Sequence, residues 1–424
     1  MSATFPRTLT IRQNLPHSAP IDIRAAVQSQ LALKFGSRIV PGARIAVAAG
    51  SRGITNLQQV VSATVDWLKE KGAIPFIVPA MGSHGGATPE GQASVLADYG
   101  ITQEAVGAPV RNSMEVKQLG RTDDGVDVYF SSEALSADGV LLVNRVKPHT
   151  DFSGTIGSGL LKMITVGLGK RMGASACHTA FALRGHEQVI RKVASVTLEL
   201  APILGGVAIL EDQFHETAQI AVLAKEEIIA GEEQLFARAR QLMPSLPFEE
   251  IDFLIVDQMG KNISGSGMDP NIIGRSVYGY MSQGPSVSSM SSVKIRRIFV
   301  RDLTAESHGN ASGIGLADLT TSRLVRAIDK QAIYVNSLTA MAPIIAKIPI
   351  YFETDAEAIT WGLTSLGIPD TSAARVVRIA STLSLEVMQV GEAFSNEIAS
   401  KENLTVIHQP QGMNFDSHNN LIPF

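Results

Sequence analysis

Residues 144–178 have the sequence NRVKPHTDFSGTIGSGLLKMITVGLGKRMGASACH, and the apolar run GVLLVN at residues 139–144 leads directly into them. A short apolar run of this kind predicts a buried strand. The segment that follows carries His149, Lys162 and His178 among two glycine-rich turns. In open α/β sheets, ligands bind beyond the carboxyl ends of the strands. We therefore expect this segment to contribute polar side chains to a binding site.

The chain before this segment predicts the same kind of sheet. Residues 44–50 and 74–80 are apolar runs typical of strands, and residues 55–71 between them predict a helix with valines on one face. Thr88 as the cap and Pro89 at the first position predict the start of another helix. Strand, helix and strand at this spacing form a βαβ unit, in which the strands are parallel. The predicted fold class is therefore α/β with largely parallel sheets.

The chain is long enough for more than one domain. At roughly 100–200 residues per domain, 424 residues correspond to two or three domains. Pro244 and Pro247 break a charged helix, and residues 252–271 then repeat the pattern of a strand that runs into a polar loop. We predict two α/β domains, an N-terminal one over residues 1–246 and a C-terminal one over residues 247–424, with an active-site cleft between them.

Composition and charge narrow the class of protein. The net charge is -4 and Lys and Arg form no long run, so we expect neither a nucleic-acid surface nor a polybasic membrane anchor. No run approaches the ~20 apolar residues of a membrane span, and the first residues lack the apolar core of a signal peptide. The single cysteine, Cys177, excludes an internal disulfide framework and fits a reducing compartment. We expect a soluble cytoplasmic enzyme for a small molecule, in an oligomeric state that the sequence leaves open.

Basic side chains follow four of the candidate strands. They are Arg52 in GSRGIT, His84 in MGSHGGAT, His149 in VKPHT, and Lys261, which stands with Gln258 in DQMGKNISGSG. An arginine fork matches a carboxylate with two hydrogen bonds, and a histidine has a pKa near the working pH of an acid–base catalyst. Each residue alone is also compatible with a structural role, as a loop arginine, a turn histidine or an exposed lysine. Their joint position at strand ends favours a shared site.

Lys162 and His178 each allow two interpretations. Lys162 has apolar neighbours in GLLKMIT, so it is either a lysine with a buried stem and a solvated head or an amine of lowered pKa that serves covalent chemistry. His178 alone does not make a metal site, because a structural zinc takes four protein ligands at typical spacings. If a metal binds here, most of its ligands must come from something other than the protein.

Taken together, these motifs resemble the nickel-dependent lactate racemase superfamily of 2-hydroxyacid racemases and epimerases. The resemblance rests on GSRG, the GSH loop, a PH followed by an FSG-containing loop and a lysine, a histidine sixteen residues after that lysine, and QxxK in the second domain. These motifs cover most of residues 44–275. Each motif alone is common, but their joint spacing makes the resemblance specific.

The resemblance implies a cofactor. Family members hold a nickel-pincer nucleotide, a nicotinic-acid-derived mononucleotide with two sulfur-bearing arms, which separate biosynthesis enzymes make and which recombinant protein can lack. One arm is attached to a lysine that corresponds to Lys162. His178 would complete the coordination of a nickel ion already bound by one carbon and two sulfurs of the cofactor. The nucleotide phosphate would bind backbone amides of the glycine-rich loop, at Ser153, Gly154, Gly157, Ser158 and Gly159.

The resemblance also implies a reaction. His84 and His149 would alternate as acid and base, while Arg52 and Lys261, with Gln258 nearby, would hold the carboxylate of the substrate. The expected enzyme is an isomerase that inverts C2 of a 2-hydroxyacid by hydride abstraction and return through a 2-oxoacid. The long loops that follow His149 and Lys261 favour a larger or more polar substrate than lactate, such as an aldonate or a dicarboxylate.

Two other functions stay compatible with the sequence. One is a nucleotide-using hydro-lyase or dehydrogenase on the same scaffold, against which stands the lack of a GxGxxG motif that follows a strand and precedes an acidic residue. The other is a non-catalytic protein that binds a carboxylate or a nucleotide. The latter predicts binding without exchange of isomers, and it predicts that both histidines can be replaced without consequence.

Overall fold

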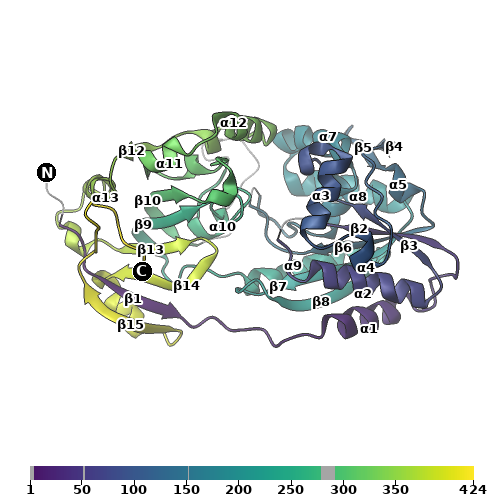
Figure 1. Cartoon of the computed structure of the whole chain (residues 1–424), viewed down its shortest axis with the longest axis horizontal. Coiled ribbons are helices and arrows are strands. Elements are labelled where there is room, and N and C mark those ends of the chain that lie inside the picture. The colour runs from purple at the N-terminus through teal and green to yellow at the C-terminus, as the bar shows by residue number, and fades with distance from the viewer. Residues whose placement is uncertain (1–3, 51–52, 151, 278–291) are drawn as a thin grey trace. The chain divides into compact units, whose positions relative to one another are not determined.

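The computed structural model describes residues 4–50, 53–150, 152–277 and 292–424 (Figure 1). The chain forms two compact units. The N-terminal unit contains His17–Met243, and the C-terminal unit contains Pro244–Phe424 together with Met1–Pro16. In the described residues, no helix combines the length and the apolar character that crossing a membrane requires.

The N-terminal unit is built on a five-stranded sheet in the order β3-β2-β6-β7-β8. The strands are β2 (Arg44–Ala49), β3 (Ile74–Pro79), β6 (Gly139–Arg145), β7 (Ile203–Glu211) and β8 (Thr217–Ala224). The first four pair in parallel, and β8 pairs with β7 in antiparallel orientation. Parallel strands with covered faces need apolar residues on both sides, which explains the nearly continuous burial of β2 and β6.

Helices cover both faces of this sheet. On one face lie α1 (Ile23–Phe35) and α2 (Leu57–Glu70) (Figure 1). Their residues Leu31 and Val61 belong to one apolar cluster with Val47 and Leu141 of the strands. On the other face, Leu160 of α6 (Leu160–Lys162) lies against Gly206 of β7, where an added Cβ would come within 3.0 Å of the leucine. The glycine therefore lets α6 approach the sheet closely.

The remaining elements of the N-terminal unit complete these layers. They are α3 (Pro89–Asp98), α4 (Gln103–Val106), α5 (Ser132–Leu135), α7 (Lys170–Arg184), α8 (His186–Leu200), α9 (Ile228–Leu242) and a separate hairpin of β4 (Val116–Arg121) and β5 (Asp127–Ser131). The start predicted for α3 is confirmed, because Pro89 is its first residue and the Thr88 side chain accepts a hydrogen bond from the Gly91 amide at 3.0 Å.

The C-terminal unit is built on an eight-stranded sheet in the order β12-β11-β10-β9-β13-β14-β1-β15. Its strands are β1 (Thr8–Gln13), β9 (Glu250–Met259), β10 (Lys294–Leu303), β11 (Leu319–Thr321), β12 (Ile350–Phe352), β13 (Val376–Ser381), β14 (Ser384–Gly391) and β15 (Leu404–Gln411). The five strands from β12 to β13 are parallel, and the others pair in antiparallel orientation. The predicted α/β class with two largely parallel sheets is confirmed.

The position of β1 differs from the predicted domain of residues 1–246. This strand pairs with β14 and β15, so residues 1–16 belong to the C-terminal unit. Leu9 and Ile11 belong to the same apolar cluster as Leu254 of β9. The main part of the C-terminal unit begins at Pro244, close to the predicted boundary. The pairing joins segments almost 400 residues apart, and a pattern local to the first residues cannot indicate such a partner.

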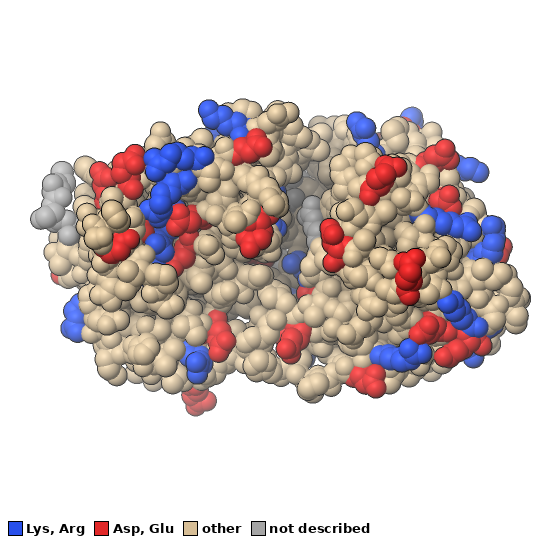
Figure 2. Space-filling view, in the orientation of Figure 1, with Lys and Arg blue, Asp and Glu red and all other residues tan. Residues whose placement is uncertain are grey.

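Helices also cover the sheet of the C-terminal unit. They are α10 (Pro270–Ile273), α11 (Ser322–Arg326), α12 (Lys330–Thr339), α13 (Asp355–Thr364) and α14 (Ser395–Ala399). Ile359 and Leu363 of α13 pack with Phe253 and Phe299 on one face, whereas Ile333 of α12 belongs to the larger cluster on the other. On the face shown in Figure 2, the basic and acidic residues are interspersed, and this face carries no broad basic surface.

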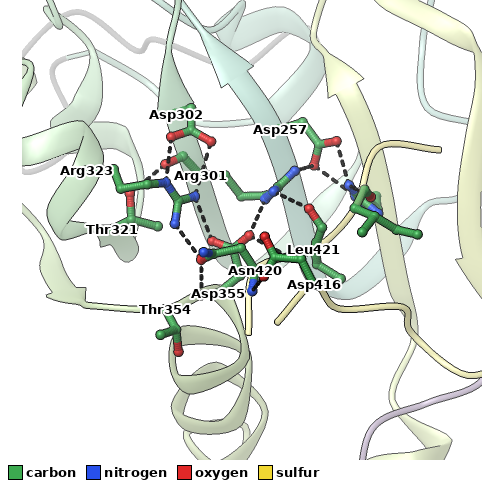
Figure 3. A network of polar contacts seen from close by, with 12 residues as sticks. Asp257, Arg301, Asp302, Thr321, Arg323, Thr354, Asp355, Asp416, Asn420 and Leu421 are labelled. Carbon is green, nitrogen blue, oxygen red and sulfur yellow. Dashed lines mark hydrogen bonds and ion pairs between the residues drawn. The ribbon is translucent and has the colours of Figure 1, made fainter. Parts of the chain in front are cut away.

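Buried ion pairs hold the last residues of the chain against this sheet (Figure 3). Arg301 of β10 contacts Asp257 of β9 at 3.0 Å and Asp355 of α13 at 2.7 Å. Arg301 also donates a hydrogen bond to the Leu421 carbonyl at 2.7 Å, and Asp355 accepts one from the Leu421 amide at 2.9 Å. Arg323 reaches Asp355 as well, at 2.9 Å. The carboxylate of Asp355 thus joins a strand, two helices and the C-terminal segment.

We expect Asp355→Asn to destabilise the C-terminal unit by about 3–5 kcal/mol, because it removes the fully buried carboxylate charge that pairs with both Arg301 and Arg323. Urea unfolding followed by circular dichroism measures the loss. Glu386→Gln is the matched control, since Glu386 pairs with Arg12 at 3.4 Å where both side chains are about half exposed. The control should change the free energy of unfolding by less than about 1 kcal/mol. Equal effects of the two substitutions would contradict this account.

Candidate functional site

The segment that follows β6 folds as a loop, a short helix and a long helix. His149 lies in the loop, Lys162 is the last residue of α6, and His178 lies on α7. Between α6 and α7 the backbone forms one π-helical stretch, Met163–Gly167. Such stretches are rare and occur often at functional sites. All three residues are half-buried, so neighbouring residues pack against them while part of their surface stays accessible to solvent.

The structure brings two of the predicted residues into direct contact. The Lys162 Nζ atom forms a hydrogen bond with the Nε2 atom of His149. The two side chains come from opposite ends of the glycine-rich loop, and an isolated bridge between Lys147 and Ser158 closes this loop at its base. An amine and an imidazole in contact can exchange a proton, which suits acid–base work at this position.

A row of rings connects His149 with His178. His149 stacks on Phe152 with a centroid distance of 4.8 Å, and Phe152 stacks on His186 at 4.9 Å. His186 in turn stacks on Phe181 at 4.4 Å, and Phe181 contacts His178 at 5.5 Å. Both phenylalanines are buried and hold the imidazoles in place. The ring contacts therefore connect His149, the predicted base, with His178, the predicted metal ligand.

His186 is a site residue that the sequence analysis missed. It is the first residue of α8, and its ring centroid lies 6.4 Å from that of His149. Its neighbours in sequence are a glycine and an ordinary amphipathic helix, which draw no attention to it. One usable signal existed, since His186 follows His178 by eight residues and stands directly after a glycine at the start of an amphipathic helix.

The backbone before Lys162 is fixed from two sides. Asn144, at the end of β6, donates a hydrogen bond to the Gly159 carbonyl at 2.9 Å. Glu232 of α9 accepts one from the Leu161 amide at 2.8 Å. An added Cβ at Gly159 would lie 2.3 Å from the second carboxyl oxygen of Glu232, so a larger residue here would displace this carboxyl group. Burial raises the pKa of Glu232 to about 7, against the opposing effect of the backbone hydrogen bonds.

The loop predicted to bind phosphate uses part of its hydrogen-bonding capacity within the protein. The Thr155 amide donates to Glu187 at 3.0 Å, and the Ser158 amide donates to the Lys147 carbonyl at 2.8 Å. The glycines of the loop are also packed closely: added Cβ atoms would lie 1.8 Å from Glu187 at Gly154 and 2.4 Å from the Lys147 carbonyl at Gly157. The phosphate-binding role of residues 153–159 stays a prediction.

The loop that carries His84 lies on the π-helical stretch. The Gly82 amide donates a hydrogen bond to the Gly167 carbonyl at 3.0 Å, and an added Cβ at Gly82 would lie 3.1 Å from the Val166 carbonyl. Gly82 has a φ of 61°, which a residue with a side chain rarely adopts. The structure thus connects the loop of His84 with the segment of Lys162, and His84 itself is half-buried.

Arg52 lies outside the described residues. Its neighbour Gly53 is held firmly, because its amide donates to the Tyr99 hydroxyl at 2.8 Å and its carbonyl accepts from Arg145 at 3.0 Å. Arg145 pairs with Glu211, whose side chain is nearly buried. The chain next to Arg52 is therefore anchored to the carboxyl ends of β6 and β7.

Gln258 and Lys261 belong to the C-terminal unit. Gln258 is exposed near the carboxyl end of β9, and Lys261 follows in a loop closed by a hydrogen bond from the Gly260 amide to the Gly267 carbonyl at 2.9 Å. The Lys261 amine donates to the Gly265 carbonyl, and its amide donates to Ser307 at 2.9 Å. Their part in holding a carboxylate, and the cleft predicted between the domains, stay predictions.

The donor set restricts the kind of metal site that the N-terminal unit could form. Among the described residues, no group of three or more His, Cys, Asp and Glu side chains is arranged to hold a metal ion. Cys177 is buried next to His178, and burial raises the pKa of its thiol to about 12, which disfavours the thiolate that metals prefer. A metal at His178 would need ligands from a bound group, and the amine of Lys162 fits the attachment of such a group.

Comparisons with known proteins agree with the fold. Residues 22–189 match the family model of the lactate racemase N-terminal domain. In three dimensions the chain is similar to the lactate racemase apoprotein from Thermoanaerobacterium thermosaccharolyticum, with a TM-score of 0.52 and 14% sequence identity. This likeness covers 89% of this chain and 99% of the other. Among curated proteins, none matches the sequence.

We expect the buried carboxyl of Glu232 to make the N-terminal unit less stable as pH rises. The pKa of Glu232 is about 7 in the folded protein and has the ordinary value of 4.5 in the unfolded chain. Between these pH values the folded protein binds a proton that the unfolded chain has lost, so the free energy of unfolding falls as pH rises from 4.5 to about 7. Relative to wild type, Glu232→Gln should gain up to about 3 kcal/mol in free energy of unfolding between pH 5 and pH 8.

The measurement is urea unfolding in a Trp361→Phe background, in which buried Trp67 of α2 is the remaining tryptophan and reports on the N-terminal unit. Glu233→Gln is the matched control, because Glu233 is the next residue of α9 but is partly exposed and paired with Arg191. The control should follow the pH dependence of wild type. If the free energy of unfolding of Glu232→Gln changed with pH as that of wild type does, Glu232 would not be the cause of the pH dependence.

Proposed function

Because residues 22–189 belong to the family of lactate racemase N-terminal domains, we propose that the protein is a racemase or epimerase of 2-hydroxyacids that works with a nickel-pincer nucleotide. The observation that carries the proposal is the contact between Lys162 and His149, from which a row of rings leads to His178. One segment thus presents an amine for attachment, an imidazole for proton transfer and an imidazole for a metal.

The reaction has a chemical reason. The hydrogen at C2 stands next to an ionised carboxylate, so it is very weakly acidic and its removal as a proton is difficult. Removal as a hydride is easier when a base takes the hydroxyl proton at the same time, and the product is a planar 2-oxoacid. The chemistry that the cofactor would supply when bound is the reversible uptake of this hydride, and the protein supplies binding, orientation and proton transfer.

The residues of the N-terminal unit fit the remaining tasks. Lys162 would hold the cofactor covalently, and His178 would be the protein ligand of the nickel. Attachment would use the amine that His149 contacts here, which releases the Nε2 atom of His149 for the substrate hydroxyl. Two bases are needed because the hydroxyl points in opposite directions in the two isomers, and His84 on its separate loop would be the second.

The substrate carboxylate would be held by Arg52 and Lys261, with Gln258 beside them. A cationic pair fixes the carboxylate and thereby aligns C2 for hydride transfer. The long polar loop that follows β9 supports a substrate that carries more polar groups than lactate. An aldonate or a dicarboxylate of the 2-hydroxyacid class meets this description.

The position of deuterium after turnover tests the reaction. A panel of C2-deuterated 2-hydroxyacids is incubated with cofactor-loaded enzyme, and the products are analysed by chiral separation and mass spectrometry. We expect inversion of one class of substrate with deuterium retained at C2. Exchange of the label with water would support a proton route instead, and turnover that requires free NAD would support a dehydrogenase.

Variants of the cofactor residues test the assignment without turnover. Lys162→Ala, incubated with cofactor-making enzymes, should show no covalent adduct by intact mass spectrometry. His178→Ala should keep the adduct but lose bound nickel. Lys192→Ala is the control lysine, since it lies on α8 and pairs with Asp123 on the surface. An adduct on the Lys162 variant, or full nickel content in the His178 variant, would refute these roles.

A further inference from the structure

A second lysine in the N-terminal unit is completely buried and has no task in the reaction described above. Lys170, the first residue of α7, has no exposed surface and a φ of 51°. This backbone conformation is strained for a residue with a side chain, and it persists only where the surroundings impose it. Burial of an amine is a further cost, and it lowers the pKa of Lys170 to about 8.

The partners of Lys170 are uncharged. Its amine donates hydrogen bonds to the carbonyl of Pro79, the last residue of β3, at 2.6 Å and to the side-chain oxygen of Gln92 on α3 at 3.0 Å. Within the described residues, no carboxylate lies within ion-pair distance of the amine, and the charge of Glu133 acts on it from further away and only partly offsets the effect of burial on its pKa. A buried charge that gains no ion pair is weak evidence for stability, because an apolar side chain of similar volume would avoid the cost of desolvation.

Gln92 connects Lys170 with the loop of His84 by hydrogen bonds. The glutamine is completely buried, and its amide nitrogen donates to the Gly82 carbonyl at 2.9 Å and to the His84 carbonyl at 3.4 Å. Lys170 and Gln92 therefore tie three elements together: the end of β3, the start of α7 next to the π-helical stretch, and the backbone on both sides of Ser83.

The loop needs such support. Gly82, Gly85 and Gly86 all have positive φ values between 61° and 65°, so the backbone around His84 is made of residues with the greatest conformational freedom. Ordering such residues costs conformational entropy, which other contacts must offset. An acid–base group must be held within fractions of an ångström of its productive position, and a misplacement of about 1 Å can cost 10²-fold in rate.

We propose that Lys170 and Gln92 are positioning residues that hold the loop of His84 in its working conformation. The inference rests on the proposed function only where it treats His84 as an acid–base group. The clamp itself, from the amine through the glutamine to two carbonyls of the loop, exists without cofactor or substrate and can be tested in the apoprotein.

Gln92→Glu is the most selective variant. A carboxylate at this position still accepts the hydrogen bond from Lys170 and adds an opposite charge, but it has no donor for the carbonyls of Gly82 and His84. We expect amide hydrogen exchange in residues 80–88 of the apoprotein to rise at least about tenfold, with α7 unchanged. Lys170→Met should raise amide exchange in the same residues, because it removes the amine that bonds to Gln92. Gln103→Glu, on the exposed face of α4, is the control.

Kinetics of the loaded enzyme separate positioning from general stability. In Gln92→Glu we expect kcat to fall about 10²-fold while KM changes less than about threefold, because the carboxylate of the substrate is held elsewhere. In a His84→Asn background the same substitution should have no further effect on kcat, since the group that it positions is gone. A merely structural role would lower kcat by the same factor in both backgrounds.

The two readouts distinguish the possible failures. Unchanged exchange of residues 80–88 in both Gln92→Glu and Lys170→Met would overturn the clamp, whatever reaction the enzyme catalyses. If exchange of residues 80–88 became faster but Gln92→Glu lowered kcat by the same factor with and without His84, the clamp would not act by positioning His84. If the wild-type protein inverts no 2-hydroxyacid, the proposed function fails, and the exchange data still decide whether Lys170 and Gln92 hold the loop.

Discussion

The buried carboxyl of Glu232 determines where the central segment begins its helix. By accepting the amide hydrogen of Leu161 it fixes the first turn of α6, while Asn144 fixes the preceding carbonyl of Gly159 from the end of β6. The position of Lys162 follows from these two contacts, because it is the next residue. Lys162 contacts His149 from this position, and the π-helical stretch begins at the next residue, Met163.

The sequence predicted the framework of the fold where the signal is local. Apolar runs identified β2, β3 and β6, and Thr88 with Pro89 identified the start of α3. It could not predict that β1 lies between β14 and β15, because a strand of six residues carries its own burial pattern but no indication of its partner. The same limit applies to the C-terminal segment, whose hydrogen bonds to Asp355 and Arg301 join distant parts of the chain.

The candidate site shows the same division between local and distant signals. His149, Lys162 and His178 were found because one stretch contains all three at a characteristic spacing. Glu232 and Gln92 were missed because each sits in an ordinary helical pattern more than 70 residues from its partner. Lys170 follows a glycine-rich turn and looks like an exposed lysine. Only packing reveals these residues, since their roles depend on burial and on which backbone groups they reach.

The hydrogen bonds of the glycine-rich loop set a condition on any phosphate that binds there. Glu187 occupies the Thr155 amide and pairs with Arg191, which also contacts the Thr155 hydroxyl at 2.7 Å. A phosphate at this amide would have to displace a carboxylate of the same sign, and Arg191 could then bind the phosphate in its place. Phosphate binding at the Thr155 amide would therefore depend on a movement of Glu187, the residue to which this amide donates.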